Sequence, residues 1–363
     1  MGAPWKDAAM IRLEDYDYTL PPERIARHPA ETRDESRLLV VERAGGRFEH
    51  RRFREIGGYL RAGDVLVLND SRVIPARLYA HRHPGGGRVE VFLVNEIEPL
   101  VWRVLVRPGK KVLKGERLIV EPGRFEGIVA DYGGRGERIV RFEAVGGHWK
   151  ELLERHGHTP LPPYILKARK SAHEAADDTA EDRERYQTVY ATKPGSVAAP
   201  TAGLHFTEAL LGELEGRGVE FARVTLHVGP GTFQPLTEER LEAGELHEES
   251  YSLEAPEAER INRARLEGRR IIPVGTTASR VLESACGAEG RLAARSGLTR
   301  LLIAPGHVFR LADAMITNFH LPRSSLLLLV CAFAGRDLML RAYREAIAQG
   351  YRFYSYGDAM LIV

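Results

Sequence analysis

The feature that most constrains the fold is a change of pattern inside the chain. Between about Tyr79 and Gly147 the sequence passes through five or six short β-type segments, such as RVEVFLVNEI and LVWRVLVRPG, with Gly- and Pro-bearing turns between them. Strands repeating every 8–12 residues or so are typical of a small barrel or sandwich. The flanking regions alternate between strand-like and helix-like segments, which is typical of an α/β sheet. The sequence therefore predicts an α/β domain, a sheet with flanking helices, interrupted by an inserted all-β barrel.

The boundaries follow from the same change of pattern. We place the inserted barrel at residues 77–149 and the discontinuous α/β domain at residues 11–76 and 150–363. Two domains suit a chain of 363 residues, since domains commonly hold about 100–200 residues. The charged stretch Lys167–Arg185 is interpreted as a surface loop or a frayed helix. The first ten residues and the part of that stretch near Ala168–Glu181 are interpreted as additions.

Composition excludes several classes of protein. The only cysteines, Cys286 and Cys331, are too few for a disulfide framework or a CxxC-type zinc site. The longest apolar run, Leu326–Phe333, is far shorter than the roughly 20 residues that span a bilayer. The N-terminal segment has no apolar stretch, so no signal peptide is expected. We therefore expect a cytoplasmic protein with no membrane partner and no metal.

Charge leaves two interpretations open. Lys and Arg total 52 and Asp and Glu total 50, a formal charge of +2. The basic residues cluster in Arg47–Glu55, Arg265–Arg270 and Arg336–Arg352. These clusters are either solvated surface paired with the many glutamates, or surfaces that contact phosphates.

Two glycine-rich segments are candidate binding loops. GSVAAPTAGLHFT contains Gly203 and His205 and leads into a predicted helix capped by Thr207, so backbone N–H groups are available to a ligand. LHVGPGTFQPL places His227, Gly229 and Gly231 at the end of a strand, where α/β proteins bind ligands. The alternatives are a tight loop with a packed histidine and a simple Gly-Pro turn.

Two further segments join strands to helices. VGTTASRVLE contains Thr276 and Thr277 and suits an anion or a ribose hydroxyl, although it lacks a Walker A motif. The alternative is an ordinary helix capped by one of these threonines. ITNFHLPRSS gathers Asn318, His320 and Arg323 before an apolar helix; its histidine could equally be a buried structural one.

Two segments that carry acidic residues complete the candidates. His247 and Glu249 in LHEE could work as an acid–base pair or be plain surface, and no HExxH zinc motif is formed. Asp358 in SYGDAMLIV precedes a predicted final strand that would deliver it to a rim. The residues alone indicate an α/β enzyme without naming a reaction.

Taken together, these segments and others resemble one family. NDSRVIPARL, LPPYI, GSVAAPTAGLHFT, LHVGPGTFQPL, TNFHLPRSSLLLLV and YRFYSYGDAMLI are similar to the S-adenosylmethionine:tRNA ribosyltransferase-isomerases of queuosine biosynthesis. The similarity runs from about Leu13 to Ile362. Departures are small: Ser325 replaces a usual Thr, Leu246 a usual Met, and His307 a usual aromatic residue.

The resemblance implies a reaction. The ribosyl group of S-adenosylmethionine would be transferred to the 7-aminomethyl-7-deazaguanine base at the tRNA wobble position and isomerised. The products would be epoxyqueuosine-tRNA, adenine and methionine. S-adenosylmethionine would be a consumed co-substrate, with no resident cofactor. The partner would be the anticodon loop of a queuosine-type tRNA, and a monomer is expected.

This chemistry assigns roles to the candidates. Base catalysis would remove a ribose C5′ proton acidified by the sulfonium, and an acid would assist adenine departure. The sequence does not show which residue is the base that removes the C5′ proton. The other candidates are assigned to contacts with the substrates. The proton-transfer pool is His205, His227, His247 and His320, with Asp70, Glu249 and Asp358 as carboxylate partners. Predicted substrate contacts are Arg72 and Arg323 to a carboxylate or phosphate, Thr276 and Thr277 to ribose hydroxyls, and Gly203, Gly229, Gly231 and Asn318 along the loops. Tyr186, Phe233, Tyr354 and Tyr356 are candidates for base stacking, unless they are core residues.

Two alternatives remain at this point. A conventional S-adenosylmethionine-dependent methyltransferase would need an acidic-Gly-x-Gly motif after its first strand, and this chain has none. A non-catalytic tRNA-binding paralogue would bind RNA without turnover.

Overall fold

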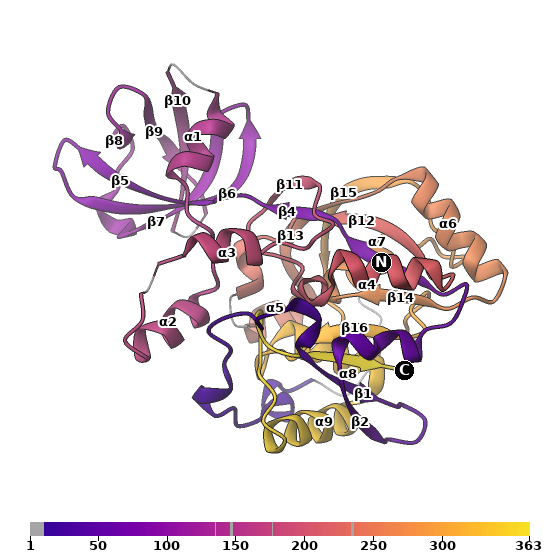
Figure 1. The fold of residues 1–363 in the computed structure, drawn as a ribbon. Coiled ribbons are helices and arrows are strands. Elements are labelled where there is room, and N and C mark those ends of the chain that lie inside the picture. Colours follow the sequence, from indigo (N-terminus) through magenta and orange to yellow (C-terminus); the bar gives the residue numbers. More distant parts are fainter. Residues whose placement is uncertain (1–10, 135, 146–147, 176, 234–235) are drawn as a thin grey trace.

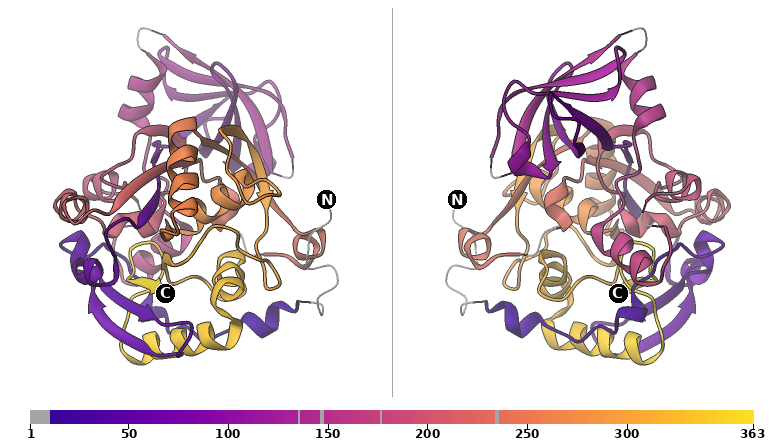
Figure 2. Two further views of the ribbon diagram at one scale, coloured as in Figure 1. Left: turned by 90° about the vertical axis from the view of Figure 1, so that its right-hand side faces the viewer. Right: turned by 90° about the vertical axis from the view of Figure 1, so that its left-hand side faces the viewer.

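The computed structural model describes residues 11–134, 136–145, 148–175, 177–233 and 236–363. A β-barrel and a larger α/β domain stand side by side, with the barrel at one end of the molecule (Figures 1 and 2). The predicted fold class is therefore confirmed. The N-terminal addition, residues 1–10, lies outside the described residues.

The α/β domain is built on one mixed sheet, which has nine strands within the described ranges. In spatial order they are β15 (Arg295–Leu301), β13 (Glu245–Leu253), β12 (Glu220–Leu226), β3 (Val65–Asn69), β14 (Ile271–Val274), β16 (Met315–Asn318), β17 (Ala359–Ile362), β1 (Arg37–Val41) and β2 (Phe48–Arg52). Strands β12, β3, β14 and β16 run parallel. β17 is antiparallel to β16 and parallel to β1. Beside this sheet, β4 (Ser71–Val73) pairs with β11 (Lys193–Ser196), so Ser71 and Arg72 of the NDSR segment lie in a strand.

The central strands are apolar on both faces because helices cover both faces. Val65 and Val67 of β3 pack with α6 and α7, whereas Leu66 and Leu68 pack on the opposite face with α4 and the 3-10 helix η4. Farther along the sheet, α8 and α9 cover β17 and β1. The α-helices are α4 (Glu208–Gly216), α5 (Glu238–Ala243), α6 (Ala255–Leu266), α7 (Thr276–Ala285), α8 (Ser325–Ala334) and α9 (Arg336–Ala348). The 3-10 helices are η1 (Leu13–Tyr16), η2 (Pro22–Arg24), η3 (Arg33–Glu35), η4 (Phe53–Tyr59), η5 (Gly109–Lys111), η6 (Thr201–His205) and η7 (Pro230–Phe233).

The barrel closes on itself and buries its alternate side chains. Its strands, in closed order, are β10 (Glu137–Ala144), β7 (Val101–Arg107), β6 (Arg88–Glu98), β5 (Arg77–His83), β8 (Arg117–Glu121) and β9 (Phe125–Tyr132). Val89, Val91 and Leu93 of β6 point inward at every second position. Helix α1 (Trp149–His156) packs against the barrel core, with the Trp149 ring 5.0 Å from that of Phe142.

The charged stretch after the barrel differs from the expected surface loop. It forms α2 (Pro163–Ser171) and α3 (Ala180–Arg185), and Pro163 begins a helix, as proline can at the first position. Arg169 and Asp182 form an ion pair at 2.7 Å with both side chains only 2% exposed. The Tyr356 hydroxyl donates to the same carboxylate at 2.8 Å. Most of this stretch is exposed or half-buried and part of it is helical, as one of the two interpretations expected, but Arg169 and Asp182 are buried against each other.

Helix length also bears on the membrane question. No helix of the described part of the chain is long and apolar enough to cross a bilayer.

Candidate active site

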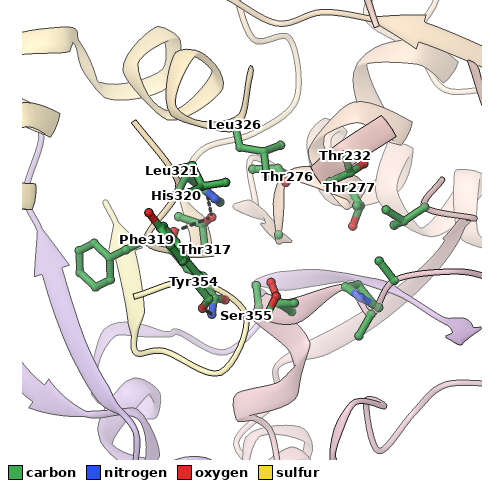
Figure 3. A pocket seen from close by; sticks show the side chains of 18 of the residues that line it. Thr232, Thr276, Thr277, Thr317, Phe319, His320, Leu321, Leu326, Tyr354 and Ser355 are labelled. Atoms are coloured by element: carbon green, nitrogen blue, oxygen red, sulfur yellow. Dashed lines mark hydrogen bonds between the residues drawn. The ribbon is translucent and has the colours of Figure 1, made fainter. Parts of the chain in front are cut away.

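A pocket lies at the carboxyl ends of the adjacent parallel strands β14 and β16 (Figure 3). From β14 the chain enters α7, which packs over β12 and β3, and after β16 it enters α8, which packs toward β17 and β1. Helices that diverge from neighbouring parallel strands leave a crevice at the strand ends, the usual place for a ligand in this architecture. The lining residues are Tyr164, Tyr186, Ala198, Ala199, Pro200, Thr201, Ala202, Val228, Thr232, Gly275, Thr276, Thr277, Thr317, Asn318, Phe319, His320, Leu321, Leu326, Tyr354 and Ser355.

Several predicted segments converge here. The GSVAAPTAG loop, the Gly-Thr-Thr turn, the TNFH segment and the C-terminal loop all contribute lining residues. Of the individual predictions, Thr276, Thr277, Asn318 and His320 line the pocket. Their catalytic or binding roles stay predictions.

The Gly-Thr-Thr turn presents hydroxyl groups to the pocket. Gly275, with φ +91°, is the N-cap of α7, so the alternative in which Thr276 or Thr277 caps this helix was wrong. Since neither threonine is used for capping, both hydroxyls are left to the pocket. Thr277 Oγ1 is buried and has no hydrogen-bond partner among the described residues. A buried hydroxyl without a partner is costly, so this atom is a natural contact for a polar ligand group.

His320 is buried and held on one side of its ring. Its Nε2 lies 2.8 Å from Thr317 Oγ1, an interaction visible in Figure 3. Its backbone N–H donates to the Tyr343 hydroxyl at 2.9 Å, and its carbonyl accepts from the Tyr18 hydroxyl. Burial lowers the pKa of His320 to about 3. The ring is therefore neutral near pH 7, and Nδ1 is the nitrogen that Thr317 does not engage.

An aromatic wall faces these polar groups. The Tyr164 and Tyr354 rings lie 4.8 Å apart, and the Tyr164 hydroxyl is 2.5 Å from Ser355 Oγ. Burial raises the pKa of Tyr164 to about 12. Asn318 Nδ2 donates to the Tyr354 carbonyl at 2.9 Å, which joins this wall to the end of β16.

Asp358 lies outside the pocket and fixes the loop that carries Tyr354 and Ser355. Its carboxylate accepts from the backbone N–H groups of Arg37 at 3.0 Å and Arg352 at 2.7 Å. It is 1% exposed, so the expectation that the final strand delivers it to a rim was wrong. Gly357 is also required here, because an added Cβ would lie 2.5 Å from the Phe353 carbonyl carbon. The loop is closed by its own backbone and by this one carboxylate.

Glu249 holds a different part of the wall. It forms a buried ion pair with Arg280, and it accepts from the Gly229 N–H at 2.9 Å and from the Thr232 hydroxyl at 3.0 Å. Thr232 lines the pocket. Glu249 thus positions the Gly-Pro-Gly turn, while its second carboxylate oxygen is paired with Arg280.

His205 lies in a second cavity on the other side of the C-terminal loop. Its Nδ1 is 2.7 Å from Ser36 Oγ. Burial lowers the pKa of His205 to about 3, with a partial opposing contribution from Asn318. Its ring is therefore neutral and is packed 5.1 Å from the ring of Phe53.

His227 and Asp70 form an electrostatic pair near the pocket. Burial lowers the pKa of His227 and the charge of Asp70 partly restores it. Asp70 is buried and accepts from the hydroxyls of Thr225 at 2.7 Å and Thr192 at 3.1 Å. His227 directly precedes the pocket residue Val228, which places this pair beside the cavity wall.

The remaining histidine, arginine and glycine candidates lie away from the pocket lining. His247 packs over Gly231, and its Nδ1 lies 3.2 Å from the guanidinium of Arg240; burial and then Arg240 lower the pKa of His247. Arg72 is exposed on β4, and Arg323 is exposed in an ion pair with Asp17. Gly203 lies under the Tyr190 hydroxyl, where an added Cβ would come within 2.0 Å.

Of the stacking candidates, Tyr186 and Tyr354 line the pocket, Tyr356 lines the second cavity, and the Phe233 side chain lies outside the described part.

Sequence reasoning missed Tyr164, Thr232 and Ser355. Tyr164 follows the two prolines of LPPYI, and Ser355 lies inside SYGD. Both signals were present, but neither residue type carries obvious chemistry. Within the described ranges no group of three or more His, Cys, Asp or Glu side chains is arranged to hold a metal ion.

Sheet, inserted barrel and strand-end pocket together define an α/β enzyme with a small-molecule site. A family model described as "Queuosine biosynthesis protein" matches residues 13–362, and the chain belongs to this family. Relatives from Desulfitobacterium hafniense and Carboxydothermus hydrogenoformans, both named S-adenosylmethionine:tRNA ribosyltransferase-isomerase, are 48% and 50% identical over 353 residues, covering 97% of this chain and 100% of each relative. A crystal structure of S-adenosylmethionine tRNA ribosyltransferase from Thermotoga maritima is 38% identical, with a TM-score of 0.53, covering 96% of this chain and 100% of that one. The family resemblance seen in the sequence is confirmed.

Proposed function

We propose that this chain transfers the ribosyl group of S-adenosylmethionine to the 7-aminomethyl-7-deazaguanine base at the wobble position of tRNA and isomerises it. The products are epoxyqueuosine-tRNA, adenine and methionine. The observation that carries this proposal is identity of about one half, over nearly the full chain, with relatives named for this activity. The pocket motifs that the family resemblance rests on are the ones that converge at the strand ends.

The pocket suits a cationic ligand. S-adenosylmethionine carries a positive sulfonium, and the described residues that line the pocket include no Arg or Lys. Four aromatic rings line it instead, those of Tyr164, Tyr186, Phe319 and Tyr354. Aromatic faces attract cations, by about 0.5–2 kcal/mol according to how dry the site is. His320 is neutral and adds no repulsion. These walls therefore favour binding of a substrate that carries a sulfonium.

His320 is the candidate that contacts the reacting ligand. It is the one member of the histidine pool that lines the described pocket. Thr317 fixes the ring through Nε2, which leaves Nδ1 for the ribose or the departing adenine. A neutral imidazole fixed in this way serves by hydrogen bonding and by brief proton transfer. Thr276 and Thr277 would take the ribose hydroxyls.

His227 is the proposed base for the amine of the tRNA. The incoming aminomethyl group must lose a proton to act as a nucleophile. Asp70 favours the protonated form of His227, so this pair can accept a proton and hold the resulting charge. His205 and His247 are then structural members of the pool, since His205 is packed against Ser36 and His247 against Gly231.

The macromolecular partner is proposed to be the anticodon loop of tRNA. A single-stranded loop can turn one base out, and such bases are bound by stacking on aromatic rings. Tyr164 and Tyr354 offer such rings in the pocket. A monomer is the proposed active unit. S-adenosylmethionine is consumed, no resident cofactor is invoked, and the reaction is assigned to the cytoplasm.

One incubation tests the proposal. Purified protein, S-adenosylmethionine and tRNA carrying the aminomethyl-deazaguanine base are mixed, and the small products are separated. Adenine and methionine, with a matching gain in mass on the tRNA nucleoside, are expected. S-adenosylhomocysteine would instead identify a methyltransferase, and tRNA binding without any product would identify a non-catalytic paralogue.

A further inference from the structure

A second cavity lies behind the C-terminal loop and contains two arginines. It shares Ser355 with the ligand pocket, so one loop separates the two. Its lining within the described residues includes no Asp or Glu. The lining residues are Pro29, Ala30, Arg33, Ser36, Arg185, Leu204, His205, Ser355, Tyr356 and Gly357.

The two arginines are anchored to backbone carbonyls. Arg33 donates to the carbonyls of Leu204 at 3.1 Å, Glu184 at 3.3 Å and Arg185 at 3.4 Å. Arg185 donates to the carbonyls of Ala30 at 2.5 Å and Glu31 at 3.1 Å. Carbonyls satisfy hydrogen bonds but do not cancel charge. Both guanidinium groups are thus fixed in place while remaining cationic.

Negative charge around this pair is insufficient. Within the described part of the chain Arg33 forms no ion pair, and the carboxylate nearest Arg185 is Glu181, at 3.7 Å and 61% exposed. Arg185 Nε is buried and has no hydrogen-bond partner there. Burial, followed by the charge of Arg185, lowers the pKa of Arg33, and Glu184 offsets this only in part. Arg352 and Arg33 also lower the pKa of His205. The cavity is therefore electropositive and partly dry.

The arginine clusters seen in the sequence differ from this cavity. Arg47 pairs with Glu42 at 2.6 Å and Arg51 with Glu49 at 2.6 Å. Arg270 forms an ion pair with Asp64. In these three cases a carboxylate of the same chain neutralises the positive charge. The cavity has only the exposed Glu181 near Arg185. Two like charges held together with so little compensation cost free energy, and an anionic ligand would remove that cost.

We propose that this cavity binds an anionic oxygen group of a substrate, with Arg33 and Arg185 as its cationic ligands. The proposal rests on the proposed function, which supplies two sources of such a group. One is the carboxylate of the methionine part of S-adenosylmethionine, whose sulfonium would lie across the Ser355 loop. The other is a phosphodiester of the tRNA next to the wobble nucleotide. Arginine forks suit both groups.

Direct binding measurements on the full chain test the proposal. Arg33→Gln removes the charge, and Arg33→Lys keeps it. Arg183→Gln is the matched control, because Arg183 lies on the same helix α3 as Arg185 and also donates to carbonyls, those of Glu154 at 2.8 Å and Gly157 at 2.6 Å. Dissociation constants for S-adenosylmethionine, for its decarboxylated analogue and for the tRNA at several salt concentrations are measured, with a thermal melt of each variant.

The two sources give different results. If the carboxylate binds here, Arg33→Gln weakens S-adenosylmethionine binding about 10- to 100-fold, the size of a charge-assisted hydrogen bond, and leaves tRNA binding unchanged. The decarboxylated analogue then binds wild type and Arg33→Gln equally. If a phosphate binds here, tRNA binding weakens instead, and the slope of log affinity against log salt falls by about one. Arg33→Lys recovers part of the loss in either case.

One outcome overturns the proposal. The proposal is wrong if Arg33→Gln binds both substrates as tightly as Arg183→Gln does. The two arginines would then have only a structural role. If Arg33→Gln fails to fold, Arg185→Gln replaces it in the same measurements, because Arg185 is the other arginine that lines the cavity. Binding of both substrates like Arg183→Gln would then overturn the proposal in the same way. Wild-type release of adenine and methionine is measured first, so a failure of the proposed function is distinguished from a failure of the cavity.

Discussion

The two cavities on either side of the Ser355 loop differ in charge. The ligand pocket is lined by hydroxyls, aromatic rings and a neutral histidine, without Arg or Lys among its described residues. The second cavity holds two arginines and no acidic residue in its described lining. One side thus suits a cation and the other an anion. S-adenosylmethionine carries both charges within one molecule, and tRNA carries the negative one.

This difference teaches where to look for a site in a chain of near-zero net charge. Most of the arginines in the basic clusters are paired with carboxylates, so the number of arginines in a segment does not indicate a binding site. The second cavity differs because its two arginines are held by backbone carbonyls, while Arg33 forms no ion pair among the described residues and the one carboxylate near Arg185, that of Glu181, is exposed. If the two cavities work as a pair, substitutions around them should differ in effect, with the largest loss at His320 and the smallest at Thr277.

His320→Gln should lower kcat/KM by about 100- to 10,000-fold, the usual range for an acid–base group. The amide can still bond Thr317, so the fold and the arginine cavity should be preserved. Steady-state release of adenine measures the loss, and a thermal melt checks the fold. His307→Gln is the control, because His307 is a partly buried histidine paired with Glu283, outside the pocket. Equal activity of the two variants would remove His320 from the mechanism.

Gly357→Ala should damage both cavities together. Its Cβ would lie 2.5 Å from a backbone carbon, so the loop that carries Ser355 must shift. A displacement of about 1 Å can cost about 100-fold in rate. Gly212→Ala in α4 is the control, because an added Cβ there meets nothing within 4 Å. Turnover and binding of both substrates are measured, and a loss confined to one substrate would show that the cavities do not share this loop functionally.

Acid should destabilise the protein through its neutral histidines. Burial lowers the pKa of His205 and of His320 to about 3, whereas the unfolded value is about 6.5. The unfolded state therefore binds more protons between these values, and stability falls as pH drops from about 6.5 toward 3. Each of the two histidines should lower the free energy of unfolding by about 2 kcal/mol at pH 5 relative to neutral pH.

Urea unfolding at pH 7.5, 6 and 5 measures this effect. The fall should be smaller in His320→Gln than in wild type, because one buried histidine is gone. The control is Thr277→Val, which removes no titratable group and should therefore follow the wild-type slope. Identical slopes for wild type and His320→Gln would contradict the assigned neutral state.

Thr277→Val should produce the smallest effect. Thr277 Oγ1 is buried and has no protein partner among the described residues, so its removal should raise the stability of the free protein by about 1 kcal/mol. If it contacts a ribose hydroxyl, the KM for S-adenosylmethionine should rise about 2- to 10-fold, the net value of one hydrogen bond. Thr277→Ser should restore the wild-type KM. An unchanged KM in the valine variant would place the ribose elsewhere.

The sequence predicted the fold more fully than the site. Short strand-like segments separated by Gly- and Pro-bearing turns located the barrel, and the alternation of strand-like and helix-like segments located the α/β domain, because burial leaves a direct mark on residue order. The GTT and NFH segments were located because small and polar residues stand out at strand ends. Asp358 was misjudged as a rim group, since its partners are backbone N–H groups more than 300 positions away in the case of Arg37.

The arginine cavity could not have been found in this way. Arg33 and Arg185 are far apart in the sequence, and nothing in their local segments distinguishes them from arginines that pair with glutamates. The same holds for Arg169 and Asp182, whose charged surroundings suggested a surface loop. Whether a charge is neutralised depends on contacts that only the folded chain brings together.

The place of β17 has a consequence for how the protein is made. Residues 359–362 lie between β16 and β1, with Leu38 beside Ala359 and Ile316 beside Leu361. Until these residues leave the ribosome, the hairpin of β1 and β2 has no neighbouring strand on the β1 side. The apolar strand β1 stays unpaired there until β17 has been synthesised. Contacts of such long range slow folding. Of the nine strands described in this sheet, the last in sequence joins its two parts, so a nascent chain that lacks β17 is incomplete inside the sheet and not merely at an edge.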